Sequence, residues 1–146
     1  MTTRAEFLAT ARGYIDTPYH HQGRLPGVGM DCPGPLICAA WEHGIKPREF
    51  DVKGYSREPD GVVLKALCDE HLEPIPFAEA QPADVLLCKF RNGHPRHMGI
   101  LTDANPRRRY WIEAESVRHK KVIESRLVFG SQYMQLVAAY RVPGLI

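Results

Sequence analysis

Apolar residues recur every three or four positions in the first half of the chain, as they do on one face of a helix. This pattern predicts three helices, over residues 4–15, 32–43 and 60–72. Thr3 stands three residues before Glu6, the spacing of a capping box at the start of the first helix. For the third helix, Asp60 is the predicted N-cap, and Val63 and Leu67 are expected to point inward.

After Pro82 the period of the pattern shortens, as in β-strands. Apolar or alternating segments separated by turn residues predict five strands, at residues 84–90, 97–102, 109–115, 120–125 and 136–142. Helices followed by strands indicate an α+β fold, in which N-terminal helices pack on an antiparallel sheet of about five strands. The sequence shows no repeat or linker, so residues 1–146 are expected to form a single domain.

The composition, with 44% hydrophobic and 25% charged residues, is typical of a soluble globular protein. No apolar run approaches the ~20 residues needed to cross a bilayer, and the N-terminus lacks an apolar signal core. We therefore expect synthesis in the cytoplasm, no membrane span, and free thiols on the four scattered cysteines. Residues 89–126 hold ten lysines and arginines against four acids, and this basic region favours an anionic partner.

The segment Asp-Cys-Pro-Gly-Pro at residues 31–35 has unusual flanks for the start of a helix. A thiol at a helix N-terminus has a lowered pKa, and nearby backbone N–H groups can form an oxyanion hole. Since Pro33 has no N–H, the expected donor is Cys32 itself, Gly34 or a side chain. Three other cysteines lie in apolar runs and are expected to be buried without a role: Cys38, Cys68 and Cys88.

A nucleophilic thiol needs a base, and a histidine base needs a third group to orient it. His97 is the best placed of the seven histidines, because it opens a predicted strand beside the open space that Gly99 leaves. If this strand pairs antiparallel with the next one, Glu113 lies close to His97. The alternative is that Glu113 faces solvent, since Glu115 shares its face of the strand.

Three segments resemble ordered motifs of the NlpC/P60 cysteine peptidases. "DTPYHHQGRLPGVGMDCPGPL" is similar to the nucleophile region of that family, and "RHMGILTD" is similar to its H-x-G-I strand. "WIEAES" lies where the family carries I-H-A. The similarity is greater to the phage-encoded branch, because it extends over nearly the whole chain to the ending "AAYRVPG".

This resemblance implies a minimal papain-like fold and hydrolysis of peptidoglycan stem peptides, typically at the bond between γ-D-glutamate and diaminopimelate. It places the nucleophile on Cys32, the general base on His97 and a third catalytic group at Glu113. Tyr19 matches the tyrosine that lines the site, and Asp31 matches the aspartate that binds the amino end of the peptide. With Gly34, these are the predicted substrate-binding residues, and no cofactor is implied.

Two positions depart from the family pattern: Pro33 replaces a serine, and Glu113 replaces a histidine, asparagine or glutamine. A carboxylate can orient imidazole and stabilises the imidazolium more strongly than an amide does. The same change is also what a copy no longer selected for catalysis would show. The alternative function is therefore a tail-tip assembly protein with the same fold and little or no activity, and an acyltransferase would use the same Cys–His pair.

Two further functions are less favoured. Cys32 with His94 and His97, or with His20 and His21, is a candidate metal site, but no C-x-x-C or H-E-x-x-H pattern occurs. Residues 107–111 and 118–121 mix cations with aromatic or histidine side chains, yet charged turns between strands are usually solvated, so nucleic acid is an unlikely partner. A chain without a signal peptide needs delivery to the cell wall, and for a phage tail protein the virion and other tail-tip proteins would provide it.

Overall fold

The computed structural model describes residues 1–52, 55, 61–90, 95–130 and 134–146. Its three α-helices and one short 3-10 helix are α1 (Arg4–Arg12), α2 (Gly34–Glu42), α3 (Gly61–His71) and η1 (Phe77–Glu79). Its strands are β1 (Arg24–Leu25), β2 (Gly29–Met30), β3 (Glu73–Ile75), β4 (Val85–Phe90), β5 (Pro95–Thr102), β6 (Tyr110–Glu115), β7 (Lys121–Arg126) and β8 (Met134–Arg141). The predicted α+β fold is confirmed.

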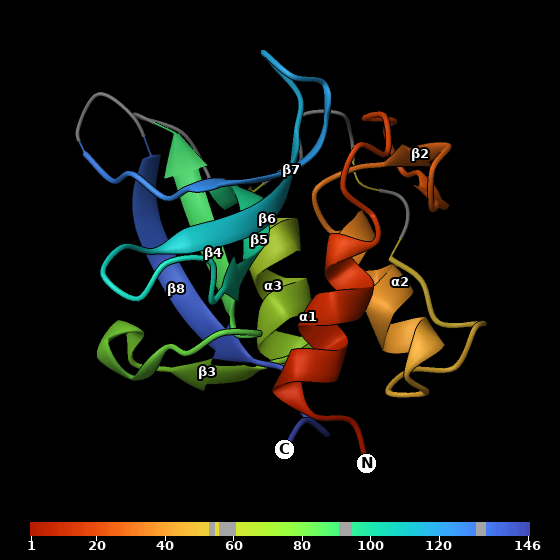
Figure 1. Ribbon diagram of the computed structural model, residues 1–146, viewed down its shortest axis with the longest axis horizontal. Helices are drawn as coiled ribbons and strands as arrows, with labels where there is room; N and C mark the ends of the chain where they lie inside the picture. The colour runs from red at the N-terminus through yellow and green to blue at the C-terminus, as the bar shows by residue number, and fades with distance from the viewer. Residues whose placement is uncertain (53–54, 56–60, 91–94, 131–133) are drawn as a thin grey trace.

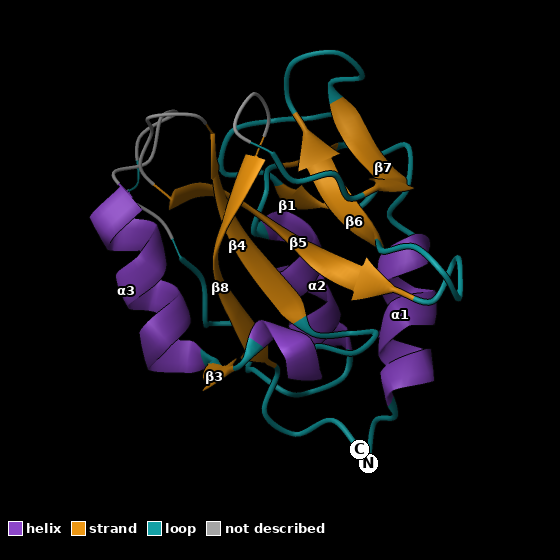
Figure 2. Ribbon diagram, turned by 90° about the vertical axis from the view of Figure 1, so that its left-hand side faces the viewer, coloured by secondary structure: helices purple, strands orange, loops and turns teal. Residues whose placement is uncertain are grey.

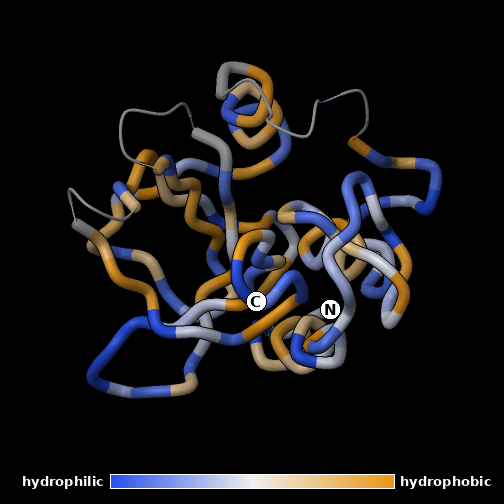
Figure 3. The backbone as a smooth tube through the Cα atoms, turned by 90° about the horizontal axis from the view of Figure 1, so that it is seen from above, coloured by the Kyte–Doolittle hydropathy of each residue, from blue (hydrophilic) through white to orange (hydrophobic). Residues whose placement is uncertain are grey.

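Six strands form one antiparallel sheet in the order β3-β8-β4-β5-β6-β7, and the helices lie together against it (Figures 1 and 2). The five predicted strands are all present in this sheet. β3 is the sixth, at the edge, where Pro74 is tolerated although it cannot donate a ladder hydrogen bond. Hydrophobic and hydrophilic stretches alternate along the backbone, and one long loop at the lower left of Figure 3 is mainly hydrophilic.

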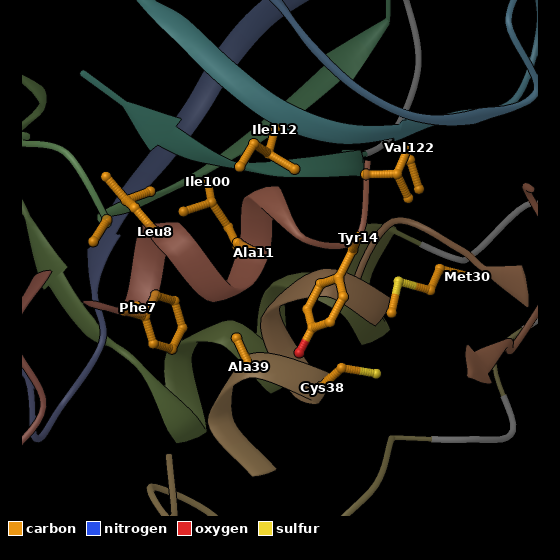
Figure 4. Packing of buried hydrophobic residues seen from close by; sticks show 12 residues of the cluster. Phe7, Leu8, Ala11, Tyr14, Met30, Cys38, Ala39, Ile100, Ile112 and Val122 are labelled. Carbon is orange, nitrogen blue, oxygen red and sulfur yellow. The ribbon is translucent and has the colours of Figure 1, made fainter. Parts of the chain in front are cut away.

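Two apolar clusters fill the helix side of the sheet. Leu8 and Ala11 of α1 pack between α2 and the sheet residues Ile100, Ile112 and Val122 (Figure 4). A second cluster joins α3 to β4, β5 and β8, and a third covers the opposite sheet face; the third contains Leu86, Cys88, Leu101, Trp111, Leu127 and Ala139. The sheet is therefore buried on both faces.

The first helix begins as predicted. Thr3 and Glu6 make both hydrogen bonds of the capping box. The third helix corrects one prediction, because Val63 is 42% exposed and the inward positions are Leu64 and Cys68. The predicted N-cap, Asp60, lies outside the described residues.

The second helix begins later than predicted, at Gly34 rather than Cys32. Pro33 is its N-cap, and Cys32 lies in the turn that precedes it. This turn follows a two-stranded ribbon of β1 and β2, which hydrophobic periodicity does not reveal in strands of two residues. The ribbon and the turn carry the chain to Cys32, the predicted nucleophile.

The two ends of the chain meet. Thr2 and Leu145 form a parallel bridge, and the Ile146 N–H donates to the Thr2 carbonyl at 3.1 Å. Arg4 N–H in turn donates to the Ile146 carbonyl at 3.2 Å. In Figure 1 this junction lies at the opposite end of the molecule from β2, the strand that leads to Cys32.

Candidate active site

Cys32 meets the sheet at the backbone of β5. β5 pairs with β6 along its residues Ile100 to Thr102. Nearer the start of β5, the Met98 N–H donates a hydrogen bond to Cys32 Sγ. Cys32 also packs against the cluster that contains Met98 and Cys68. Because Met98 directly follows His97, the sulfur lies beside the strand position that carries the predicted base.

The pKa of Cys32 differs from the expectation. Burial raises this pKa most, the neighbouring Asp31 carboxylate raises it further, and the hydrogen bond from Met98 N–H lowers it without reversing the shift. The predicted lowering by the helix is wrong for the free protein, because Cys32 precedes the helix and its sulfur lies among apolar side chains. At neutral pH the thiol form therefore predominates, and forming a thiolate requires a proton acceptor.

His97 and Glu113 form a buried pair. His97 Nε2 lies 2.9 Å from Glu113 Oε1, and each residue is only 8% exposed. The pairing of Ile100 with Ile112 sets the register that brings the two residues together, as antiparallel pairing predicts. The solvent-facing alternative for Glu113 is wrong.

The imidazole of His97 is held between two aromatic rings. Phe90 stacks on it with ring centroids 5.9 Å apart, and Trp111 meets it edge-on at 5.3 Å. The space beside Gly99 is not open as predicted, because a Cβ at this position would lie 2.4 Å from Trp111 Cε3. Glycine at position 99 therefore makes room for the Trp111 indole, which packs against the ring of His97.

The Glu113 carboxylate has a partner at both oxygens. Oε1 accepts from His97, while Oε2 accepts from Trp111 Nε1 at 2.7 Å and from Ser125 Oγ at 2.6 Å. Burial acts to raise the pKa of Glu113, but the bonds from His97, Ser125 and Trp111 outweigh burial and lower it. Sequence reasoning missed Trp111 and Ser125, since one strand register has to be known before either can be placed beside position 113.

The hydrogen-bond partners of Glu115 differ from those of Glu113. Its carboxylate accepts backbone N–H groups of the following turn, at 2.7 Å from Val117 and 2.9 Å from Arg118. It therefore caps a turn at the end of β6, whereas Glu113 points into the buried network. The two acids on one strand have different roles because the partners of Glu113 are the side chains of three strands, whereas those of Glu115 are mainly backbone N–H groups of the turn.

Asp31 is the centre of a second buried network. Its Oδ1 lies 2.6 Å from Arg24 Nη1, and its Oδ2 accepts the Gln22 N–H at 2.8 Å and the hydroxyl of Tyr55. Arg24 is also paired with Asp51 at 2.9 Å. The side chains of Asp31 and Arg24 are 1% and 7% exposed, so a peptide amine at Asp31 has to share these existing partners.

The remaining predicted binding residues lie on the same stretch of chain. Gly34 donates its N–H to the Asp31 carbonyl at 3.0 Å, which uses the backbone donor that was a candidate for the oxyanion hole. Tyr19 is half-buried and bridges Met30, two residues before Cys32. The structure thus gathers Tyr19, Asp31 and Gly34 around the turn that holds Cys32.

The described residues support neither of the two candidate metal sites. Nowhere in the described part of the chain do three or more His, Cys, Asp or Glu side chains group as a metal site. His20 is exposed, His21 meets the ring of Tyr55, and His94 lies outside the described residues.

No helix among those described is long and apolar enough to span a bilayer. All four cysteines lie in the described part of the chain and form no disulfide, and Cys38, Cys68 and Cys88 are buried as predicted.

Solved structures share this architecture. The NlpC/p60 domain of the peptidoglycan hydrolase SagA matches with a TM-score of 0.63 and 20% sequence identity, over 97% of this chain and 100% of that domain. A lipoprotein-like protein of the NLP/P60 family from Staphylococcus aureus matches with a TM-score of 0.61 and 18% identity, over 95% of this chain and 41% of its own length. No protein-family model and no curated protein matches the sequence. The chain therefore has the papain-like α+β fold of NlpC/P60 domains.

Proposed function

We propose that the protein is a cysteine peptidase that hydrolyses amide bonds in peptidoglycan stem peptides. The observation that carries the proposal is the buried pair of His97 and Glu113, which lies next to the strand residue whose N–H binds Cys32 Sγ. The fold supports it, because structural neighbours include an NlpC/p60 domain of a peptidoglycan hydrolase. Cys32 is the nucleophile, His97 the base and Glu113 the orienting group.

The hydrogen bonds of Glu113 indicate which nitrogen of the His97 imidazole carries the proton. Two donors bind Glu113 Oε2 and its pKa is lowered, so the group is a carboxylate that only accepts. His97 Nε2 therefore carries the hydrogen that bonds to Oε1, and Nδ1 keeps the lone pair. Nδ1 is the atom that takes the proton from Cys32.

The reaction follows from this arrangement. His97 Nδ1 removes the proton from Cys32 Sγ as sulfur attacks the carbonyl carbon, and the Glu113 carboxylate stabilises the imidazolium. The imidazolium then protonates the leaving amine, and the acyl group stays on sulfur as a thioester. Water, deprotonated by Nδ1, releases the acid and restores the thiol. Burial raises the pKa of Cys32, so the thiolate forms only with the help of the base.

We further propose the bond between γ-D-glutamate and diaminopimelate as the target, and a phage or prophage tail as the place of action. The stem peptide is rich in carboxylates, and the basic residues Arg118, Lys120 and Lys121 lie between β6 and the start of β7, where the Tyr19 N–H donates to the Lys120 carbonyl at 2.8 Å. The rival function is a tail-tip assembly protein with the same fold and little or no catalytic activity.

The test is release of peptides from purified diaminopimelate-type peptidoglycan, read by mass spectrometry. Wild type should release fragments that identify the bond, and Cys32→Ala should release none. Cys38→Ala is the matched control, since Cys38 is also a thiol of this region but is buried within α2. Absence of cleavage by wild type, with no selective alkylation of Cys32, would favour the assembly function.

The tail association has its own test. Particles purified from a phage or prophage that carries this gene should contain the protein when analysed by mass spectrometry. Particles that lack it would refute this part of the proposal and leave the peptidase activity to be judged separately.

A further inference from the structure

The carboxylate of Glu113 divides its two oxygens between two tasks. Oε1 faces His97 Nε2, whereas Oε2 receives Trp111 Nε1 at 2.7 Å and Ser125 Oγ at 2.6 Å. A carboxylate that can rotate would present either oxygen to the imidazole in several geometries. With Oε2 held by two donors from different strands, only Oε1 remains for His97.

We propose that Trp111 and Ser125 are positioning residues, which clamp Glu113 Oε2 so that Oε1 fixes the tautomer and orientation of His97. This inference rests on the proposed peptidase function. Neither residue was predicted from the sequence, and neither has to touch the substrate for this role.

Strand register makes the clamp rigid. Trp111 and Ser125 are paired residues of β6 and β7, and Glu113 lies two residues from Trp111 on the same face of β6. His97 comes from β5, so the network joins three neighbouring strands of the sheet. If the Glu113 carboxylate moves, it has to break a hydrogen bond to β5, β6 or β7. Each of these strands is held in place by its own backbone hydrogen bonds to its neighbours.

Trp111 acts on the histidine in a second way. Its indole is fully buried and meets the His97 ring edge-on, with an angle of 89° between the ring planes. The close fit to Gly99 leaves the indole little room to shift. One side chain therefore holds both members of the pair, the imidazole through its ring edge and the carboxylate through its N–H.

The clamp also suits the unusual residue at position 113. A carboxylate that is 8% exposed tends to become protonated unless donors stabilise its charge. A protonated Glu113 would offer a donor to His97 and could no longer keep the hydrogen on Nε2. The two extra donors therefore maintain the protonation state on which a Cys–His–Glu arrangement depends.

Three single variants test the clamp. Trp111→Phe keeps an aromatic ring and removes the N–H, and Ser125→Ala removes the hydroxyl. Tyr140→Phe is the matched control, because it also removes a buried aromatic donor to a carboxylate, at 2.6 Å from Asp69, on the other side of the sheet. The readouts are the pH titration of the Glu113 carboxyl carbon and the His97 ring nitrogens by NMR, and the pH dependence of Cys32 alkylation by iodoacetamide.

Each of the two variants should raise the pKa of Glu113, reduce the Nε2–H tautomer of His97, and slow Cys32 alkylation at pH 6 about tenfold, the effect of one lost hydrogen bond to a charged group. The control should change none of these. If Ser125→Ala and a folded Trp111→Phe both leave the Glu113 titration and the His97 tautomer as in wild type, the clamp is overturned. Failure of the peptidase proposal looks different: the NMR signals respond to the variants, while wild type releases no peptide from peptidoglycan.

Discussion

Glu113 Oε1 accepts a hydrogen bond from His97 Nε2 at 2.9 Å, and both side chains are almost completely buried. An imidazole in such a pair has one nitrogen committed and one nitrogen with a lone pair. In the proposed mechanism this lone pair at Nδ1 receives the proton of Cys32, whose Sγ accepts the N–H of Met98, the residue after His97. This relationship leads to most of the expectations that follow.

Glu113→Gln should lower the rate of peptide release by about 10²- to 10⁴-fold, in the range known for removal of the charge that orients a catalytic histidine. The amide keeps the shape, but its NH₂ group has to face one of the three donors now held by Glu113. Initial rates on peptidoglycan measure the effect. Retention of near-wild-type rates would show that the carboxylate does not take part.

His97→Ala should slow alkylation of Cys32 at pH 7 by more than about tenfold, with recovery only at alkaline pH. Burial raises the pKa of this thiol, so without a base little thiolate exists near neutrality. His119→Ala is the control, because His119 is also paired with a glutamate, at 3.2 Å from Glu115, but is exposed. Equal alkylation profiles of the two variants would argue against His97 as the base.

Gly99→Ala should lower both the stability and the activity. The added Cβ would lie 2.4 Å from Trp111 Cε3 and 2.8 Å from the Ile112 carbonyl, so the indole has to move. Overpacking of this kind costs about 1–3 kcal/mol of unfolding free energy. Gly13→Ala provides the comparison, since Gly13 has a helical φ of −63° and its added Cβ would come no closer than 3.1 Å to a neighbour, the Thr10 carbonyl oxygen. Denaturant unfolding of both variants decides whether the strain is specific to position 99.

Arg24→Met should destabilise the fold by about 3–5 kcal/mol, because it leaves the Asp31 carboxylate buried without its cation. Lys65→Met breaks a pair of similar length, 2.8 Å to Asp69, that is nearly half exposed, and should cost no more than about 1 kcal/mol. Unfolding in urea compares the two. A double variant, Arg24→Met with Asp31→Leu, should lose less than the sum of its single changes.

Glu115 makes stability depend on acidic pH. Burial acts to raise its pKa, but the N–H groups of Arg118, His119 and Val117 lower it to about 2. Because the unfolded value is about 4.3, the carboxylate stabilises the fold above that pH, and this contribution is lost as pH falls toward 2. Glu115→Gln should thus reduce the unfolding free energy at pH 6 and change it little at pH 2. An equal loss at both values would contradict the assignment, and exposed Glu49→Gln is the control.

Local signals predicted most of the fold. The capping box of Thr3 and Glu6 and the five main strands follow from spacing alone. Some features were not predicted correctly. β1 and β2 have only two residues each, too few for a periodic pattern. Leu64 and not Val63 points inward, because packing on the sheet decides which face of α3 is covered.

The site shows the same division between local and distant information. The sequence identified Cys32, His97 and Glu113 as candidates, and strand register explains why the last two meet. The raised pKa of Cys32 and the donors from Trp111 and Ser125 were not predictable. Each of them arises from side chains of other elements that come together only in the folded sheet.

The bridge between Thr2 and Leu145 has a topological consequence. Since both ends leave the molecule at one corner, a short peptide can join them, and new ends can be opened in the exposed turn at residues 106–109. Such a circular permutant should keep the sheet and the site intact. By the same geometry, a second domain fused to either end would hold the molecule by that corner and leave the end that carries β2 directed outward.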